Sequence, residues 1–385
     1  MFRFKISLLL SALLSLCGCA QLDDYMLGKD NTPSPKILQP VPNGVNLTKK
    51  WSLSSLSRTV VQYNKLQPQI QGQIIYIATN DGIVKAIDRF NGKLIWEKKL
   101  ATGLVSGPTV NADLIALGTD RASIIVLAAE NGKLLWQQKI SGDSLAKPII
   151  AKDQVIVKTI DGNTYALNVA NGEKIWMSVH GAPALILKAS SSPIVVGDRM
   201  VLVGFADGKM DALDLHTGHL LWQRAIAYAA GSSDVERLID ISADPIVSDG
   251  VAYIVSYQGF IGALSLQDGQ LLWRKPASVY KNMVLAKDTL YITDSKDVIW
   301  AINKKNGRVR WKQIALKARG LTEPVIMGKN LIIGDQTGLL HVLATRNGNF
   351  IGRIQYDDAI SLAYVAHNGI YLMTNKGKLS HFAVS

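Results

Sequence analysis

The chain has 385 residues, of which 48% are hydrophobic and 19% are charged, a composition typical of one large or two ordinary folded domains. Its formal charge is +12, yet no dense Lys/Arg block occurs, which argues against a nucleic-acid partner and favours a well-solvated basic surface. Both cysteines lie close together near the N-terminus, so the body of the chain has neither a structural disulfide nor a thiolate metal site.

The first nineteen residues predict export and lipidation. Arg3 and Lys5 precede the apolar run from Ile6 to Leu16, which is too short for a permanent membrane span and is typical of a signal peptide. Leu16-Cys17-Gly18-Cys19 resembles the bacterial lipobox, so we expect residues 1–18 to be removed and Cys19 to be lipidated. Ala20 replaces the aspartate of inner-membrane retention, and the resemblance therefore implies an outer-membrane lipoprotein that faces the periplasm of a Gram-negative bacterium. An ordinary secretory signal with incidental cysteines is the alternative.

Residues 19–45 are predicted to form a flexible tether. Prolines and small polar residues dominate this stretch, and it lacks the apolar periodicity of a strand or a helix. A flexible chain of this length has a root-mean-square reach on the order of 30 Å, enough to hold a globular domain clear of lipid headgroups.

The body of the chain repeats a glycine-to-tryptophan motif. The first copy is Asn91-Gly92-Lys93-Leu94-Ile95-Trp96, and six related copies follow it. The last copy has Gly352 in the tryptophan position. Successive glycines are 40, 40, 46, 51, 38 and 41 residues apart, which is the period of a four-stranded propeller blade. The copies begin at these glycines: Gly92, Gly132, Gly172, Gly218, Gly269, Gly307 and Gly348.

Each repeat contains alternating apolar runs joined by Asn/Asp-Gly turns, the pattern of consecutive β-hairpins. A single sheet of this size cannot bury both faces, so the sheets must stack into a closed ring. Seven repeats are complete. Three further strands between Ile360 and Val384, together with one around Asn46 to Trp51, predict an eighth blade built from both chain ends. We therefore predict an all-β, eight-bladed β-propeller over residues 46–385, with a seven-bladed ring as the alternative.

The repeated tryptophans are expected to pack between neighbouring blades. The motif resembles the tryptophan-docking repeat of the pyrroloquinoline-quinone (PQQ) dehydrogenases, which makes an enzyme of that family the catalytic alternative. Those enzymes hold the quinone and Ca²⁺ with carboxylates and stack the quinone on a vicinal disulfide. The present chain has no such cysteine pair or calcium-loop carboxylate cluster, and its six histidines form no recognisable catalytic motif. We therefore expect no cofactor, no metal and no catalysis.

Two connectors between repeats are longer than the others. Five repeats have a proline 24 or 25 residues before their glycine, but 12, 12, 17, 23 and 13 residues separate that proline from the preceding tryptophan. The additional residues lie in the adjacent connectors Met177 to Ser192 and Gln223 to Asp244, which emerge on one face of a propeller. An apolar stretch, Pro183 to Leu187, predicts a protein interface there, unless its leucines fold back over the propeller.

The lipobox, tether, repeats and long connectors together resemble the BamB family, lipoprotein subunits of the outer-membrane β-barrel assembly machinery. The resemblance covers essentially the whole chain and is most specific at residues 185–188 and 231–240. It implies that Leu185, Leu187 and Lys188 contact the POTRA domains of BamA, with lysine replacing the family's arginine and losing its bidentate fork. Asp240 matches an acidic family position. Glu236 and Arg237 also match, although they can equally hold the loop together.

The resemblance implies a non-catalytic scaffold that binds BamA and helps unfolded outer-membrane proteins to fold and insert, acting as a monomer within the complex. A periplasmic propeller that binds glycan or peptidoglycan is the second alternative. It predicts retention on that polymer with both long connectors dispensable, whereas a quinoprotein predicts cofactor absorbance and Ca²⁺-dependent dye reduction.

Overall fold

Each sequence repeat folds into one antiparallel sheet whose strands follow one another along the chain. A computed structural model describes residues 33–41, 44–54, 65–187, 190–228, 232–367 and 369–384. Tight turns join the strands; at Thr79 to Gly82, for example, Gly82 has a φ of +84° and its amide donates to the Thr79 carbonyl. In a turn of this kind a Cβ atom would be strained, which is why glycine recurs there.

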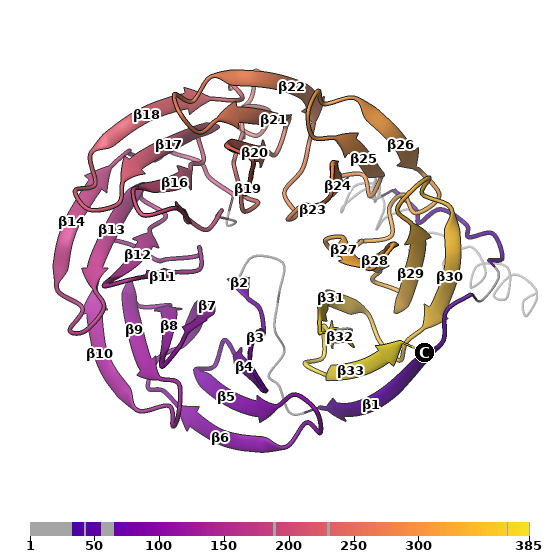
Figure 1. The fold of residues 1–385 in the computed structure, drawn as a ribbon, viewed down its shortest axis with the longest axis horizontal. Coiled ribbons are helices and arrows are strands. Elements are labelled where there is room, and N and C mark those ends of the chain that lie inside the picture. The colour runs from indigo at the N-terminus through magenta and orange to yellow at the C-terminus, as the bar shows by residue number, and fades with distance from the viewer. Residues whose placement is uncertain are drawn as a thin grey trace, which may run out of the picture. The chain divides into compact units, whose positions relative to one another are not determined.

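Eight sheets form a ring, with their first strands at the centre and their fourth strands at the rim (Figure 1). Blades 1 and 2 contain β3 (Gln69–Gln71), β4 (Ile74–Ala78), β5 (Ile83–Asp88), β6 (Leu94–Lys99), β7 (Leu104–Asn111), β8 (Leu114–Thr119), β9 (Ser123–Ala128) and β10 (Leu134–Lys139). Blades 3 and 4 contain β11 (Ile149–Ala151), β12 (Gln154–Lys158), β13 (Asn163–Asn168), β14 (Lys174–Val179), β15 (Ile194–Val196), β16 (Met200–Gly204), β17 (Lys209–Asp214) and β18 (Leu220–Ala225).

The second half of the ring repeats this order. Blades 5 and 6 contain β19 (Ile246–Ser248), β20 (Val251–Val255), β21 (Gly259–Ser265), β22 (Leu271–Ala277), β23 (Val284–Ala286), β24 (Thr289–Thr293), β25 (Ile299–Asn303) and β26 (Val309–Gln313). Blades 7 and 8 contain β27 (Val325–Met327), β28 (Asn330–Gly334), β29 (Leu339–Ala344), β30 (Phe350–Gln355), β31 (Ile360–Ala366), β32 (Gly369–Thr374), β33 (Leu379–Val384) and β1 (Leu47–Leu53). The predicted eight-bladed propeller is confirmed, and the seven-bladed alternative is wrong.

The two chain ends close the ring. Strand β1 pairs antiparallel with β33, with Leu47 opposite Val384 and Leu53 opposite Leu379, so the first strand completes the last sheet. Because both ends share one sheet, opening the ring requires breaking strand pairing as well as packing between blades.

The tryptophans join neighbouring blades, as predicted. In seven of the eight junctions, the indole Nε1 donates to a backbone carbonyl in the next blade at 2.8–3.0 Å. The ring covers the turn glycine of that blade; a Cβ added to Gly172 would lie 2.5 Å from the Trp136 ring. At the remaining junction Gly352 occupies the tryptophan position, and the Gly44 amide donates instead to the Ile351 carbonyl at 3.0 Å.

A β-bulge precedes each repeated tryptophan from blade 1 to blade 6, and the same shift recurs in blade 7. In blade 1, Ala86 pairs with Trp96 but Ile87 pairs with Leu94, so Ile95 has no partner across the sheet. Equivalent shifts occur in blades 2 to 7. A bulge re-aims the following side chain, which accounts for the indole pointing at the next blade.

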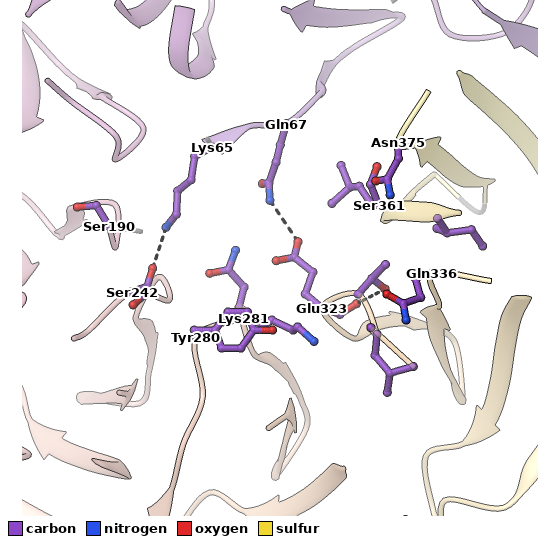
Figure 2. Close-up of a pocket in the computed structure, with 16 residues that line it drawn as sticks. Lys65, Gln67, Ser190, Ser242, Tyr280, Lys281, Glu323, Gln336, Ser361 and Asn375 are labelled. Atoms are coloured by element: carbon purple, nitrogen blue, oxygen red, sulfur yellow. Dashed lines mark hydrogen bonds between the residues drawn. The ribbon is translucent and has the colours of Figure 1, made fainter. Parts of the chain in front are cut away.

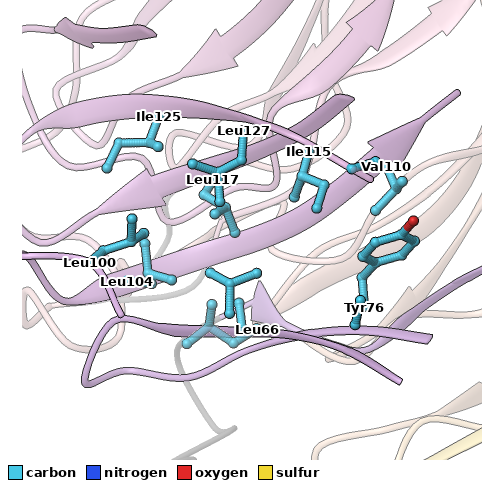
Figure 3. Packing of buried hydrophobic residues seen from close by; sticks show 13 residues of the cluster. Leu66, Tyr76, Leu100, Leu104, Val110, Ile115, Leu117, Ile125 and Leu127 are labelled. Carbon is cyan, nitrogen blue, oxygen red and sulfur yellow. The ribbon is translucent and has the colours of Figure 1, made fainter. Parts of the chain in front are cut away.

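Packing between blades is apolar along the strands. Between blades 1 and 2, a buried cluster brings Tyr76 of β4 beside Val110 and Ile115 of blade 2 (Figure 3). The cluster includes Leu66 of β2 (Lys65–Leu66), a short additional strand that pairs in parallel with the inner edge of β7. No helix in the described part of the chain is long and apolar enough to cross a membrane.

The compact unit containing all these strands begins at Ile37, whereas the sequence predicted a tether up to residue 45. Leu38 packs against the buried cluster that contains Leu331 and Leu343, and the Gln39 carbonyl accepts a hydrogen bond from Arg353. These tertiary contacts hold an extended, proline-rich segment that has no regular structure of its own, which the local sequence does not reveal.

Candidate partner-binding surface

Both long connectors lie where the sequence predicted them, between the outer strand of one blade and the inner strand of the next. One joins β14 to β15 and the other joins β18 to β19, so they flank blade 4 (Figure 1). They lie on the same face of the ring because all connectors leave the same ends of the outer strands. We call this the connector face.

His180 anchors the start of the first connector. Its Nδ1 lies 2.6 Å from an Asp211 carboxylate oxygen, its Nε2 lies 3.1 Å from Asp207, and its ring stacks on Phe205 at 3.7 Å between centroids. Burial by itself lowers the pKa of His180, but the two carboxylates outweigh burial and raise the pKa to about 9. The imidazole is therefore charged at neutral pH and ties the connector to blade 4.

The predicted apolar stretch of the first connector is divided between solvent and protein. Leu185 is 47% exposed, whereas Ile186 and Leu187 are half-buried. The latter two line a cavity of about 20 Å³, together with Lys158, Phe205 and other residues. Leu185 therefore projects outward, as expected for an exposed interface. Leu187 partly covers the propeller, as expected if the leucines fold back over it. Lys188 lies outside the described residues, as does Cys19.

Glu236 and Arg237 shape a turn in the second connector. The Glu236 carboxylate accepts hydrogen bonds from the amides of Ser232 and Ser233, and the Ser233 hydroxyl accepts from the Glu236 amide, which is the reciprocal pattern of a capping box. Arg237 donates to the Ser232 carbonyl at 3.1 Å. The hydrogen bonds from Ser232 and Ser233 lower the pKa of Glu236. In this turn Val235 projects outward, with 64% of its surface exposed.

Asp240 lies in the interior. Only 2% of its surface is exposed, and its backbone forms a bridge with Tyr257. Its carboxylate Oδ2 has no hydrogen-bond partner among the described residues. Burial raises the pKa of Asp240 to about 7 against the attraction of Lys158 and Lys65, and burial lowers the pKa of Lys158 to about 8. The side chain predicted to contact a partner is therefore not presented at the surface.

The reason is local geometry. Ile239 and Ile241, on either side of Asp240, are both buried, because the connector returns here to the centre of the ring before β19. An alternating apolar segment indicates a strand but does not show which face solvent reaches.

Two exposed apolar side chains were missed by sequence reasoning. Tyr228 is 70% exposed in the second connector, and Val179 at the end of β14 is also exposed. An aromatic residue inside an inserted connector was the available signal, since solvent seldom selects one there.

A third long connector was also missed. It leads from β1 to β3, and the 17 residues from Trp51 to Pro68 equal the spacing from Trp176 to Pro193. Residues 55–64 lie outside the described chain, and β2 follows them inside the ring. Measuring the tryptophan-to-proline spacing from Trp51 onward would have revealed this connector.

Strand β2 lines a central polar cavity of about 270 Å³ (Figure 2). Lys65 forms an ion pair with Asp244 and donates to the Ser242 carbonyl at 3.2 Å, which fixes the end of the second connector. On the other side, Gln67 accepts from Lys147 at 2.6 Å and donates to Glu323 at 3.5 Å. The central network thus links the connectors to several blades. Among the described residues, no group of three His, Asp or Glu side chains is arranged to hold a metal ion.

Comparison with known proteins supports an assembly role for this architecture. The family profile described as outer membrane protein assembly factor BamB matches residues 80–313. The outer membrane protein assembly factor BamB of Legionella pneumophila is 55% identical over 384 residues, covering 99% of this chain and all of that protein.

Solved structures agree on the fold. BamB from Moraxella catarrhalis superimposes with a TM-score of 0.80 at 26% identity, covering 88% of this chain and 100% of that one. Quinohemoprotein alcohol dehydrogenase from Comamonas testosteroni has a TM-score of 0.70 at 13% identity, covering 87% and 76%, and shares the fold alone. The whole-chain identity and the shared eight-bladed ring show that the chain belongs to the BamB family of outer membrane protein assembly factors.

Proposed function

We propose that this protein is a non-catalytic scaffold subunit of the outer-membrane β-barrel assembly machinery, and that its connector face docks on the POTRA domains of BamA. The observation that carries the proposal is the set of apolar side chains on two adjacent, firmly anchored connectors: Leu185, Tyr228 and Val235. An apolar centre with a charged margin is the usual composition of a protein interface. Such a scaffold presents unfolded outer-membrane proteins for insertion and needs no reaction or cofactor.

The residues of the two connectors have different roles in the proposed interface. Leu185 and Leu187 supply apolar contact, and Lys188, which follows Leu187 in the sequence, supplies the cationic contact. Glu236 and Arg237 hold the turn that exposes Val235. Asp240 supports the base of the second connector from inside the ring, in place of the direct contact predicted from the sequence.

The N-terminal region supplies the membrane attachment in this proposal. Residues 1–18 are removed, Cys19 is lipidated, and the tether up to residue 36 leads to the compact unit that starts at Ile37. One copy of the protein then faces the periplasm from the outer membrane. The name outer membrane protein assembly factor, carried by the full-length relative, supports this location.

Capture of BamA by the soluble chain Ala20 to Ser385 tests the proposal. We expect Leu185→Asp to weaken the binding of the BamA POTRA segment by about tenfold or more, because a charge placed in an apolar interface must be desolvated. Leu135→Asp is the matched control, since Leu135 is also 47% exposed but lies on the outer strand of blade 2. Affinity is measured by surface plasmon resonance, and circular dichroism verifies that each variant is folded.

Equal affinities for the wild type and both folded variants would place the interface elsewhere on the propeller. Failure of the wild type to bind BamA, combined with retention on peptidoglycan, would contradict the scaffold proposal and support the glycan-binding alternative.

A further inference from the structure

Positive charge is concentrated in one part of the ring. The stretch from Ile299 to Gln355, described throughout, contains ten Lys and Arg residues but only two acidic residues, Glu323 and Asp335. This excess of eight charges compares with +12 for the whole chain. Such an uneven distribution creates a local field that net charge alone does not describe.

Both acidic residues of this stretch point inward. Asp335 is fully buried and pairs with Arg319, while Glu323 lines the central cavity. Lys304 is also compensated, because it pairs with Asp249 of blade 5 at 2.7 Å. Of the other eight cations, Arg353 is half-buried and Lys317 is exposed in the connector between β26 and β27. The remaining six are exposed on the rim and on the turns opposite the connector face, and we call them the basic rim: Lys305, Arg308, Arg310, Lys312, Lys329 and Arg346.

Contacts between blades 6 and 7 join the elements that carry the basic rim. The turn that carries Arg346 packs on blade 6, because Gly348 lies under the Trp311 ring and its carbonyl accepts a hydrogen bond from Gln313. The same turn is joined to Lys329 through two hydrogen bonds from Thr345 to the Lys329 carbonyl. Blade packing therefore holds these cations in fixed relative positions.

The compact unit begins beside this rim. Leu38 packs against the same buried cluster as Trp311 and Phe350, and the Gln39 carbonyl accepts from Arg353 at 2.9 Å. Figure 1 shows this N-terminal segment passing outside β30 before the chain enters β1. The residues that lead back to Cys19 therefore connect to the unit at the blades that carry the basic rim.

We infer that the basic rim binds anionic phospholipid headgroups of the membrane leaflet that carries the lipid anchor, an inference that rests on the lipidation of Cys19 proposed above. Residues 19–36 can span at most about 60 Å, so the anchor keeps the compact unit within that distance of the membrane surface. Each Lys or Arg within a Debye length of an anionic membrane strengthens binding about fivefold. The connector face lies at the opposite ends of the strands and stays free for a protein partner.

Vesicle cosedimentation with the soluble chain Ala20 to Ser385, which retains the whole compact unit, tests the rim without the lipid anchor. The vesicles are pure phosphatidylcholine or phosphatidylcholine mixed with an equal amount of phosphatidylglycerol. We expect binding only to the phosphatidylglycerol vesicles, and loss of that binding at high salt. The variant Lys305→Gln/Arg308→Gln/Lys329→Gln/Arg346→Gln should bind at least about tenfold more weakly.

The matched control removes four exposed cations from blades 1 and 2: Lys93→Gln/Lys98→Gln/Lys133→Gln/Lys139→Gln. The two variants have the same net charge, so the control should stay within about twofold of the wild type if position matters. Equal weakening of both folded variants, no binding by the wild type, or tighter binding to duplex DNA than to the vesicles would overturn the inference. BamA capture by the rim variant should be intact, so failure of the membrane inference leaves the scaffold proposal separately testable.

Discussion

Replacing Gly172 with alanine is expected to lower the free energy of unfolding by about 3 kcal/mol, whereas Gly250→Ala should cost only about 1 kcal/mol. The two glycines have nearly the same backbone conformation, with φ of +76° and +74°. A Cβ at position 250 meets nothing within 4 Å, but at position 172 it would lie 2.5 Å from Cε3 of Trp136. The difference between the two variants therefore isolates the tryptophan docking.

Urea unfolding followed by tryptophan fluorescence measures both variants. The alanine at position 172 must displace the Trp136 indole, whose Nε1 bonds to the Val169 carbonyl at 2.8 Å in the same blade as the glycine. Equal destabilisation of the two variants would show that the glycine is required only for its backbone conformation, and that the ring contributes little to joining blades 2 and 3.

Protonation of His180 is expected to contribute about 3 kcal/mol of stability that disappears in alkaline solution. The pKa of this largely buried imidazole rises from about 6.5 in the unfolded chain to about 9 in the folded protein, because Asp207 and Asp211 outweigh burial. A group whose pKa is higher in the folded protein than in the unfolded chain stabilises the folded protein fully only at pH values below the unfolded-chain pKa. The contribution should therefore be complete below about pH 6.5 and lost as the pH rises through about 9.

The measurement is the unfolding free energy of the wild type and of His180→Gln between about pH 6 and about pH 10. The difference between the two proteins should fall by about 3 kcal/mol across this range. In an Asp207→Asn/Asp211→Asn background the same comparison should lose its pH step, because the charged imidazole no longer has carboxylate partners. A pH-independent difference in the original background would contradict the assignment of a charged clamp at the first connector.

Repetition made the fold predictable. Each repeat carries its own turn glycines, apolar strands and tryptophan, so each blade is specified locally, and the period leaves a stacked ring as the way to bury both faces of every sheet. The partial repeats at Asn46 to Trp51 and Ile360 to Val384 even predicted which strands close the ring, as the pairing of β1 with β33 confirms. The β-bulge before each tryptophan was missed because it leaves no signature besides the motif itself.

The candidate site was predicted less completely. Departures from the repeat located both long connectors, but aligning the repeats more closely would also have revealed His180. The equivalent positions hold Leu100, Ile140 and Ile226, and all four amides donate to a carbonyl of the preceding turn, which belongs to a glycine in three repeats and to Ala122 in the fourth. A histidine at a position that is otherwise apolar requires a partner, and Asp207 and Asp211 supply it.

The sequence by itself determined the blade, the number of blades, the closing strands and the connectors that differ from the rest, because each of these follows from local pattern and period. Tertiary structure decided which connector side chains solvent reaches: Leu185 outward, Leu187 partly covered and Asp240 inside. It also gathered the basic rim from turns of two blades and placed the N-terminal segment beside it. Exposure and proximity depend on how distant segments pack against each other, and that information is not contained in any one repeat.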